Sequence, residues 1–334
     1  MLQSILNKLY QCNSLSQSET YYLFKIIISG KLEPIQIAAA LIAMKVRGEN
    51  PEEIAGAASA LLKHVKPFPR PDYIFADIVG SGGDHSNSIN ISTPSAFVAA
   101  CCGMKIAKHN NRSISSKSGS SDLLEAFGIN LDISPKQARQ ALDDLNVCFL
   151  FAPKYHAGFI HAIPVRNKLK TPTIFNLIAP LINPAKPPLA MIGVYSPNLV
   201  LPIAETLKIL GTYHRAIVVH GGGMDKVVLH SPTQVAELHN GKITTYQLNQ
   251  EDFGFRAQNK KALQAGSTEK NRDILMRVLK GKGKLAHEQV IAVNVAMLLK
   301  IFGNEDLYDN AQYALEVIRS GQAYKRIIAL AARG

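Results

Sequence analysis

Apolar residues recur at helical spacing through the first part of the chain, and two start signals there predict where helices begin. Ser16 and Glu19 form a capping box ahead of the apolar run at 21–28. Asn50 followed by Pro51 is typical of an N-cap and the first helical position. Few side chains in this part suit chemistry. We therefore expect residues 1–66 to form an all-helical domain that serves packing.

Closely spaced prolines at 67, 69 and 71 end this helical part, because they exclude regular helix. Beyond them, buried strands and helices are predicted to alternate. The strands are expected at 74–79, 147–151, 189–194 and 215–219 and near 235 and 244; the helices lie at 135–145, 199–210, 271–279, 287–301 and 310–320. This alternation predicts an α/β fold over 72–334 with a mainly parallel central sheet.

Polar, glycine-rich segments follow successive strands, which is where an α/β sheet binds its ligands. Gly80, Gly82 and Gly83 permit positive φ, and consecutive N–H groups in such a turn bind anions. The segments 90–93 and 108–122 add hydroxyl groups and the charge of Lys108. Together these groups suit a phosphate or pyrophosphate better than an apolar ligand.

The glycine-rich segment does not match the common nucleotide-binding motifs. No Lys-Ser/Thr pair follows the glycines as in a Walker loop, and the spacing differs from the dinucleotide fingerprint. By itself, the stretch 80–84 is explained equally well as an ordinary turn. Three polar clusters at successive strand ends favour anion binding. No Ser-His-Asp or Cys-His arrangement is evident, so we expect no covalent nucleophile.

Composition adds a basic balance, with Lys+Arg 37 against Asp+Glu 25 and a net charge of +12 over 334 residues. This charge suits an acidic ligand, nucleic acid or an anionic surface, although the scattered basic residues also fit a solvated surface. The four cysteines form no CxxC pair, which is typical of a reducing compartment. With no signal segment and no run of transmembrane length, we expect a cytoplasmic protein without a membrane partner.

Three of these segments closely resemble the anthranilate phosphoribosyltransferase family. They are Gly80-Ser81-Gly82-Gly83-Asp84, Asn90-Ile91-Ser92-Thr93 and Lys108-His109-Asn110-Asn111-Arg112. The family reads Gly-Thr-Gly-Gly-Asp, Asn-x-Ser-Thr and Lys-His-Gly-Asn-Arg, and the resemblance covers essentially the whole chain. It implies a fold like that of nucleoside phosphorylases and phosphoribosyltransferases. In that fold residues 165–186 rejoin the helical domain, and that domain forms a homodimer.

The resemblance also implies the reaction. A phosphoribosyl group passes from 5-phosphoribosyl 1-pyrophosphate (PRPP) to the amine of anthranilate, the second step of tryptophan biosynthesis from chorismate, and pyrophosphate leaves. Positioning and charge stabilisation carry such a transfer, here by Lys108 and Asp225 with Mg²⁺ as cofactor. The chain contains no amidotransferase segment, so it resembles the stand-alone form, and association with anthranilate synthase is a further expectation.

Site residues follow from the resemblance by position. Substrate binding is expected from Gly80, Gly83, Asp84, Ser88, Asn90, Ile91, Ser92, Thr93, Lys108, His109, Asn110, Asn111, Arg112, Ser113, Ile114, Ser115, Ser116, Ser120, His156 and Arg166. Asn111 and Arg166 are expected at anthranilate, and His109 and His156 along its path. Ser92 and Asp225 are the expected magnesium ligands.

Several positions depart from the family pattern. Ser81 keeps the hydroxyl of threonine, Pro172 replaces a frequent arginine and Ala179 a glycine. Asn110 stands where the family has glycine, so we expect a positive φ there and a side chain that narrows the site. Lys226 stands where the family has a glutamate metal ligand. An ammonium cannot ligate magnesium, so Lys226 either neutralises pyrophosphate directly or weakens activity, and we expect reduced magnesium affinity.

Two alternatives to the active enzyme stay open. One is a catalytically impaired relative that still binds the sugar phosphate. The other is a nucleic-acid-binding relative, which the net charge permits but which would have little use for three intact phosphate-binding segments. Pyrimidine nucleoside phosphorylases share the architecture but carry a different glycine and lysine pattern. The preserved segments favour the enzyme.

Overall fold

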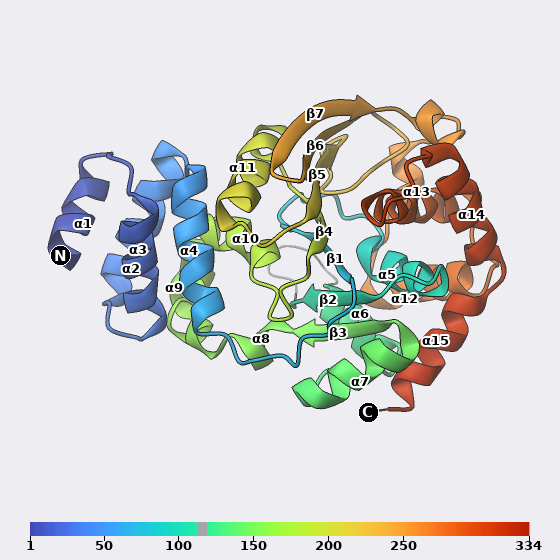
Figure 1. The fold of residues 1–334 in the computed structure, drawn as a ribbon, viewed down its shortest axis with the longest axis horizontal. Helices are drawn as coiled ribbons and strands as arrows, with labels where there is room; N and C mark the ends of the chain where they lie inside the picture. The colour runs from blue at the N-terminus through green and yellow to red at the C-terminus, as the bar shows by residue number, and fades with distance from the viewer. Residues whose placement is uncertain (113–118, 334) are drawn as a thin grey trace.

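The first part of the chain forms a bundle of helices, as the apolar spacing predicts. The computed structural model describes residues 1–112 and 119–333. The bundle comprises α1 (Leu2–Tyr10), α2 (Gln17–Ile28), α3 (Pro34–Arg47) and α4 (Pro51–Lys63), which lie together at one end of the molecule (Figure 1). Both predicted start signals are present: Ser16 and Glu19 close a capping box on α2, and Asn50 caps α4 ahead of Pro51.

A later segment packs against these helices. It contains α9 (Ile163–Leu169) and α10 (Ile174–Ile178), and α8 (Ala152–Tyr155) precedes it in the chain. Phe175 of α10 contacts Phe24 of α2, with ring centroids 5.4 Å apart. The same apolar core continues onto α11 (Val200–Leu210) and onto Ile192 and Val218 of the sheet. Since one core joins all of these elements, the division into 1–66 with 165–186, and 72–334, stays a prediction.

The centre of the molecule is a seven-stranded sheet in the order β3-β2-β1-β4-β5-β6-β7. Its strands are β1 (Ala76–Gly80), β2 (Ile106–Asn110), β3 (Val147–Phe151), β4 (Leu189–Gly193), β5 (Arg215–Gly221), β6 (Thr233–His239) and β7 (Lys242–Leu248). The first five run parallel, β6 pairs antiparallel with β5, and β7 pairs antiparallel with β6. The mainly parallel sheet is thus confirmed. The strand order reverses at β1 and β4, because the chain continues from β1 to β2 and β3 on one side and from β4 to β5 on the other. Such a switch point opens a crevice for ligands.

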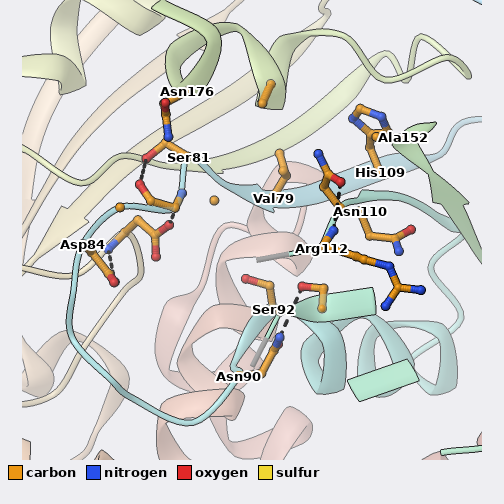
Figure 2. Close-up of a pocket in the computed structure, with 18 of the residues that line it drawn as sticks. Val79, Ser81, Asp84, Asn90, Ser92, His109, Asn110, Arg112, Ala152 and Asn176 are labelled. Atoms are coloured by element: carbon orange, nitrogen blue, oxygen red, sulfur yellow. Dashed lines mark hydrogen bonds between the residues drawn. The ribbon is translucent and has the colours of Figure 1, made fainter. Parts of the chain in front are cut away.

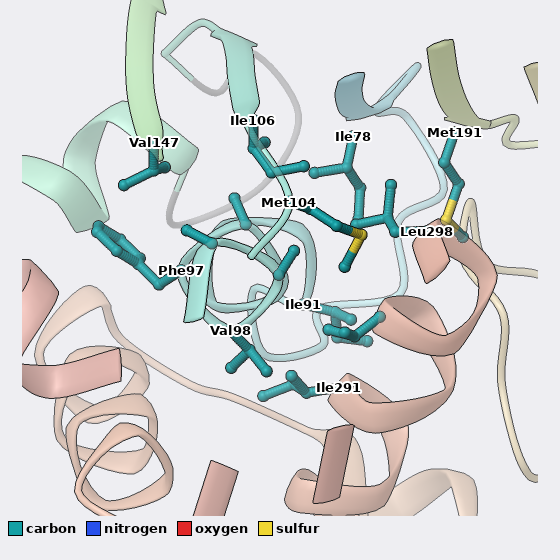
Figure 3. Close-up of a cluster of buried hydrophobic side chains, with 14 of the residues drawn as sticks. Ile78, Ile91, Phe97, Val98, Met104, Ile106, Val147, Met191, Ile291 and Leu298 are labelled. Carbon is teal, nitrogen blue, oxygen red and sulfur yellow. The ribbon is translucent and has the colours of Figure 1, made fainter. Parts of the chain in front are cut away.

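Helices cover the face of the sheet opposite the bundle (Figure 1). They are α5 (Ser92–Cys101), α6 (Ser120–Ala126), α7 (Pro135–Leu145), α12 (Thr268–Leu279), α13 (Leu285–Ile301), α14 (Leu307–Arg319) and α15 (Gln322–Ala331). Figure 3 shows Phe97 and Val98 of α5 between Ile106 of the sheet and Ile291 of α13, and all four side chains are fully buried. Burial of this size fixes α5, and hence its N-terminus, beneath the ends of β1 and β2.

The last helix, α15, is an element that the sequence-based prediction missed, because it placed the final helix at 310–320. Gly321 adopts φ +70° between α14 and α15, so the chain turns and starts a new helix. Ala323, Ile327 and Leu330 form its buried face. Their spacing is a helical signal in its own right. Among the described residues, no helix has the length and apolarity needed to cross a membrane.

Candidate active site

A cavity of about 240 Å³ opens at the carboxyl ends of β1 and β2, beside the switch point. Figure 2 shows Ser81 and Asp84 of the loop after β1 on one side, and His109 and Ala152 on the other, with Ser92 below them. Segments far apart in the chain therefore meet here, as expected for ligand sites in parallel sheets.

Two glycines let the turn that carries Asp225 cross the strand ends. Gly80 and Gly193 are register partners at the ends of β1 and β4. A Cβ on Gly80 would overlap the Asp225 carboxylate, and one on Gly193 would overlap the main-chain carbonyl of Asp225. The close approach buries Asp225, whose Oδ2 accepts the Gly82 N–H at 3.0 Å. Sequence reasoning singled out Gly80 but gave Gly193 no role, because its importance depends on a turn distant in the chain.

Lys226 places a positive charge beside the carboxylates of Asp225 and Asp84. Its ammonium forms an ion pair with Oδ1 of Asp225 and donates to the Asp225 main-chain oxygen at 3.1 Å. Burial raises the pKa of Asp225, and Lys226 opposes that rise. Burial also acts to raise the pKa of Asp84, but the Lys226 charge and the hydrogen bonds from Ser86 outweigh it and leave that pKa lowered. One ammonium thus favours the charged form of two neighbouring carboxyl groups.

Lys108 contacts buried groups behind the cavity, the Ile78 carbonyl and Asp77. Its ammonium donates to the main-chain carbonyl of Ile78 at 2.6 Å, although the residue lines the cavity. Asp77 lies close to it, where Oδ1 accepts the His109 N–H at 3.2 Å and Oδ2 accepts from the Asn183 amide at 2.8 Å. Burial lowers the pKa of Lys108 to about 8, against the attraction of Asp77. Lys108 therefore keeps most of its charge at neutral pH.

The segment before α5 ties together the polar floor of the cavity. Asn90 accepts the N–H of Thr93 at 3.0 Å through Oδ1 and donates to the Ser120 hydroxyl at 3.2 Å. Ser92, the first residue of α5, lines the cavity, while the Thr93 hydroxyl is buried behind it and has no partner among the described residues. The positive end of the α5 dipole and these hydroxyls together favour an anion here.

The opposite side of the cavity is largely apolar and carries Arg166. Its guanidinium lies over the Phe175 ring, 5.1 Å from the centroid, and burial lowers its pKa to about 10. No acidic partner for it exists among the residues that the structure describes. Phe159, Ala152 and Ile182 complete the wall. A guanidinium group that lies on an aromatic ring in an apolar wall suits a small aromatic carboxylate.

The two predicted histidines are both buried and uncharged at neutral pH. Burial lowers the pKa of His109 well below its usual value and that of His156 to about 4. Their rings lie 5.3 Å apart, and a ring nitrogen of His156 bonds the Ile182 carbonyl at 2.9 Å. His109 lines the cavity, whereas His156 stands behind it and supports the His109 ring.

Asn110 differs from the expectation of a positive φ. It is the last residue of β2, and its φ is not positive. Its side chain is buried and donates from Nδ2 to the Ser121 hydroxyl of α6 at 2.9 Å. Arg112, next along, is half exposed and pairs with Asp122 and Glu125 of α6. The end of β2 and the residues just after it are therefore tied to α6 by side chains.

Most of the predicted site residues come together in this one cavity. Those lining it are Gly80, Gly83, Asp84, Ser88, Asn90, Ile91, Ser92, Lys108, His109, Asn110, Asn111, Arg112, Ser120, Arg166 and Asp225. Thr93 and His156 lie outside the lining, and Ser113, Ile114, Ser115 and Ser116 lie outside the described residues. Sequence reasoning missed the apolar wall, notably Phe159 and Phe175, because apolar residues carry no signal that separates a ligand wall from a core.

Magnesium fits part of the donor set. The Asp225 and Asp84 carboxylates and the Ser92 hydroxyl are the hard oxygen donors that this ion prefers. In residues 1–112 and 119–333, however, no group of three or more His, Cys, Asp or Glu side chains could hold a metal by itself. The Lys226 ammonium already compensates Asp225. The site therefore suits a magnesium ion that brings phosphate oxygens of a ligand with it.

Comparison with known proteins gives matches along the whole chain. The glycosyl transferase family a/b domain matches residues 72–324, and the glycosyl transferase family helical bundle domain matches residues 3–65. The anthranilate phosphoribosyltransferase of Erwinia tasmaniensis is 69% identical over 333 residues, with 100% of both chains covered. That of Serratia proteamaculans is 66% identical over 333 residues, again with 100% of both chains covered.

Solved structures with a similar fold are also anthranilate phosphoribosyltransferases. The anthranilate phosphoribosyltransferase of Thermus thermophilus superposes with a TM-score of 0.92 at 36% identity, and 98% of each chain is covered. The Saccharomyces cerevisiae enzyme in complex with PRPP and Mg gives a TM-score of 0.90 at 28% identity, covering 99% of this chain and 98% of the other. A further structure of the yeast enzyme contains 4-fluoroanthranilate.

Proposed function

Because the chain belongs to the anthranilate phosphoribosyltransferase family, we propose that its cavity holds PRPP at the glycine-rich loop and anthranilate against Arg166. The protein transfers the phosphoribosyl group of PRPP to the amine of anthranilate, giving N-(5-phosphoribosyl)anthranilate and pyrophosphate, in tryptophan biosynthesis. One observation carries the placement of the two substrates: a single cavity joins the Gly80–Asp84 loop to the Arg166 guanidinium.

The diphosphate of PRPP takes the polar half of the cavity. The Gly80–Asp84 loop, the first residue of α5, Lys108 and Lys226 all line that half. These donors are in place before the ligand arrives, so they stabilise the charge that grows on departing pyrophosphate without reorganising. The structure offers positioning and charge, which suffice when the attacking group is an amine that needs no activation.

Anthranilate takes the apolar half, where its carboxylate pairs with Arg166. The unpaired guanidinium on the Phe175 ring supports this assignment. Phe159 and Ala152 contact the aromatic ring of the substrate in our proposal, and neutral His109 borders the path of the amine. Fixing the carboxylate at Arg166 and the sugar at the Gly80 loop would hold the two reactants in one cavity, which is the positioning that such a transfer needs.

Magnesium is the proposed cofactor. Ser92 and Asp225 are the proposed ligands together with diphosphate oxygens, and the ion would neutralise charge on the leaving pyrophosphate. A PRPP and Mg complex of the yeast relative supports this assignment. Reduced magnesium affinity, expected from Lys226, stays part of the proposal.

A homodimer in the cytoplasm is also proposed. The apolar side chains of Ile35 and Val46 on α3 are 79% and 77% exposed, and Ile160 is 66% exposed. Exposed apolar residues on the helical bundle support its role as the dimer surface. Association with anthranilate synthase stays a prediction. The impaired and nucleic-acid-binding alternatives are not favoured, given 69% identity to a relative of this activity.

The transfer is tested by following anthranilate fluorescence with purified protein, PRPP and a magnesium titration. The chain contains no tryptophan, so protein emission does not overlap this signal. We expect fluorescence loss that requires protein and PRPP and that increases with magnesium. A folded protein that binds both substrates but causes no loss would identify an impaired relative.

A further inference from the structure

We propose that the Lys226 ammonium takes the place of one divalent cation in the diphosphate half, so that this protein binds PRPP with fewer metal ions than an acidic residue at 226 would require. The inference rests on the proposed function, because it concerns the same PRPP site. Its basis is the position of the ammonium among the carboxylates of the cavity.

Lys226 places its ammonium against a buried carboxylate of the cavity. Its side chain is only 15% exposed, and its ammonium contacts the carboxylate of Asp225, which is 4% exposed. The loop around Asp225 also receives the Asp84 side chain, whose Oδ2 accepts the Asp225 N–H at 3.4 Å. The ammonium lies 3.1 Å from where a Cβ of Gly80 would stand, at the end of β1, and Lys226 lines the cavity.

Both oxygens of Asp225 are engaged by the protein itself. Oδ1 pairs with the Lys226 ammonium, and Oδ2 accepts the Gly82 N–H. A divalent ion entering here would have to displace the ammonium or accept its repulsion at close range. A diphosphate, in contrast, can take hydrogen bonds from the ammonium directly, since Lys is a point-charge donor for phosphate oxygens.

Charge balance leads to the same result. With Lys226 present, two carboxylates, Asp84 and Asp225, face one ammonium. With glutamate at 226 the same space would hold three carboxylates, and a polyanionic ligand would enter only together with additional cations. The lysine therefore lowers the number of metal ions that must accompany PRPP.

The test is the magnesium dependence of PRPP affinity, measured by isothermal titration calorimetry without anthranilate. The slope of log affinity against log free magnesium counts ions taken up on binding. We expect the slope of the natural protein to be lower by about one than that of Lys226→Glu. Ions that PRPP carries in solution cancel in this difference, because both proteins receive the same ligand.

A second variant covers the case in which Lys226→Glu does not fold. Lys226→Gln removes the charge and keeps a polar side chain. In EDTA it should bind PRPP about tenfold or more weakly than the natural protein, since hydrogen bonds to charged groups are strong. Lys260→Gln is the matched control. Lys260 is an exposed lysine that bonds the nearby Gly222 carbonyl at 2.9 Å, outside the cavity, so its removal should leave slope and affinity unchanged.

Equal slopes for the natural protein and Lys226→Glu, or equal metal-free affinity for the natural protein and Lys226→Gln, would overturn this inference while leaving the transferase intact. Absence of PRPP binding by the folded natural protein at every magnesium concentration would instead overturn the proposed function, and this inference with it. A lower slope together with metal-free binding that depends on Lys226 supports the proposal.

Discussion

In the polar half of the cavity, where we propose the diphosphate binds, Lys226 partly compensates Asp84 and Asp225. In the apolar half, the proposed acceptor half, the Arg166 guanidinium lies on an aromatic ring with no acidic partner among the described residues. The first arrangement fixes the geometry of the charges before any ligand enters. The second leaves one charge that a ligand must satisfy.

This difference separates what each half contributes. A compensated cluster can be packed tightly, as the contacts of Gly80 and Gly193 with the Asp225 turn show, and it is sensitive to small displacements. An uncompensated cation selects for an anionic group and tolerates small changes in its walls. Substitutions in the polar half should therefore change PRPP affinity and the reaction rate. Substitutions in the apolar half should change the affinity for anthranilate alone.

The largest expected effect comes from Gly193→Ala, which would disrupt only the diphosphate half. The added methyl overlaps the Asp225 carbonyl, so the turn must move, and we expect kcat/KM to fall about 100-fold because catalysis is sensitive to displacements near 1 Å. Steady-state kinetics with both substrates checks this. Gly103→Ala is the control. Its φ of +88° is unfavourable for alanine, so stability should fall, but its methyl group meets open space, so the specific activity of the folded protein should stay unchanged. Equal activity losses in the two variants would refute the role of the close contact.

Arg166→Ala tests the acceptor half in the same way. Loss of a charge-assisted pair should raise the KM for anthranilate by roughly tenfold to 100-fold and leave PRPP affinity unchanged. Calorimetry with each substrate separates the two effects. Arg112→Ala removes an arginine that already pairs with Asp122 and Glu125, and its effect on anthranilate should be smaller. A larger effect of Arg112→Ala than of Arg166→Ala would place the anthranilate carboxylate at Arg112 instead.

Raising the pH sharpens the contrast without mutation. Lys108, with a pKa lowered to about 8, is mostly protonated at pH 7 and loses its charge as pH rises through that value. Arg166, with a pKa of about 10, remains mostly charged at pH 9. PRPP affinity should fall by up to about tenfold between pH 7 and pH 9 while anthranilate affinity changes little. If both affinities fall in parallel, Lys108 is not the group responsible.

The smallest expected effect is that of Phe175→Leu. Leucine keeps apolar contact with α2 but removes the ring beneath Arg166, and a cation–π contact contributes about 0.5–1 kcal/mol, so the KM for anthranilate should rise severalfold. The same kinetic assay measures it, with PRPP as the internal control. A change in PRPP affinity of equal size would show that the two halves are coupled through α10.

Much of the fold follows from local signals. The Ser16 capping box, the Asn50-Pro51 helix start and the runs at 135–145 and 147–151 each became the predicted element. These signals act over a few residues, through capping, spacing and turn preference, and so can be read along the chain. The glycine- and hydroxyl-rich segments were placed at strand ends for the same reason, since such clusters mark the ends of strands.

What the sequence by itself determined was the class of fold, the family, and the position of the glycine- and hydroxyl-rich segments that we propose bind the anion. Tertiary structure alone decided how residues distant in the chain constrain one another. Gly193 matters because the Asp225 turn crosses it, Asn110 turns its side chain toward Ser121 from an ordinary strand conformation, and Phe175 becomes the platform of Arg166. The physical reason is range: backbone preferences are set by neighbours, whereas close approach, burial and charge compensation depend on which strand ends the topology brings together.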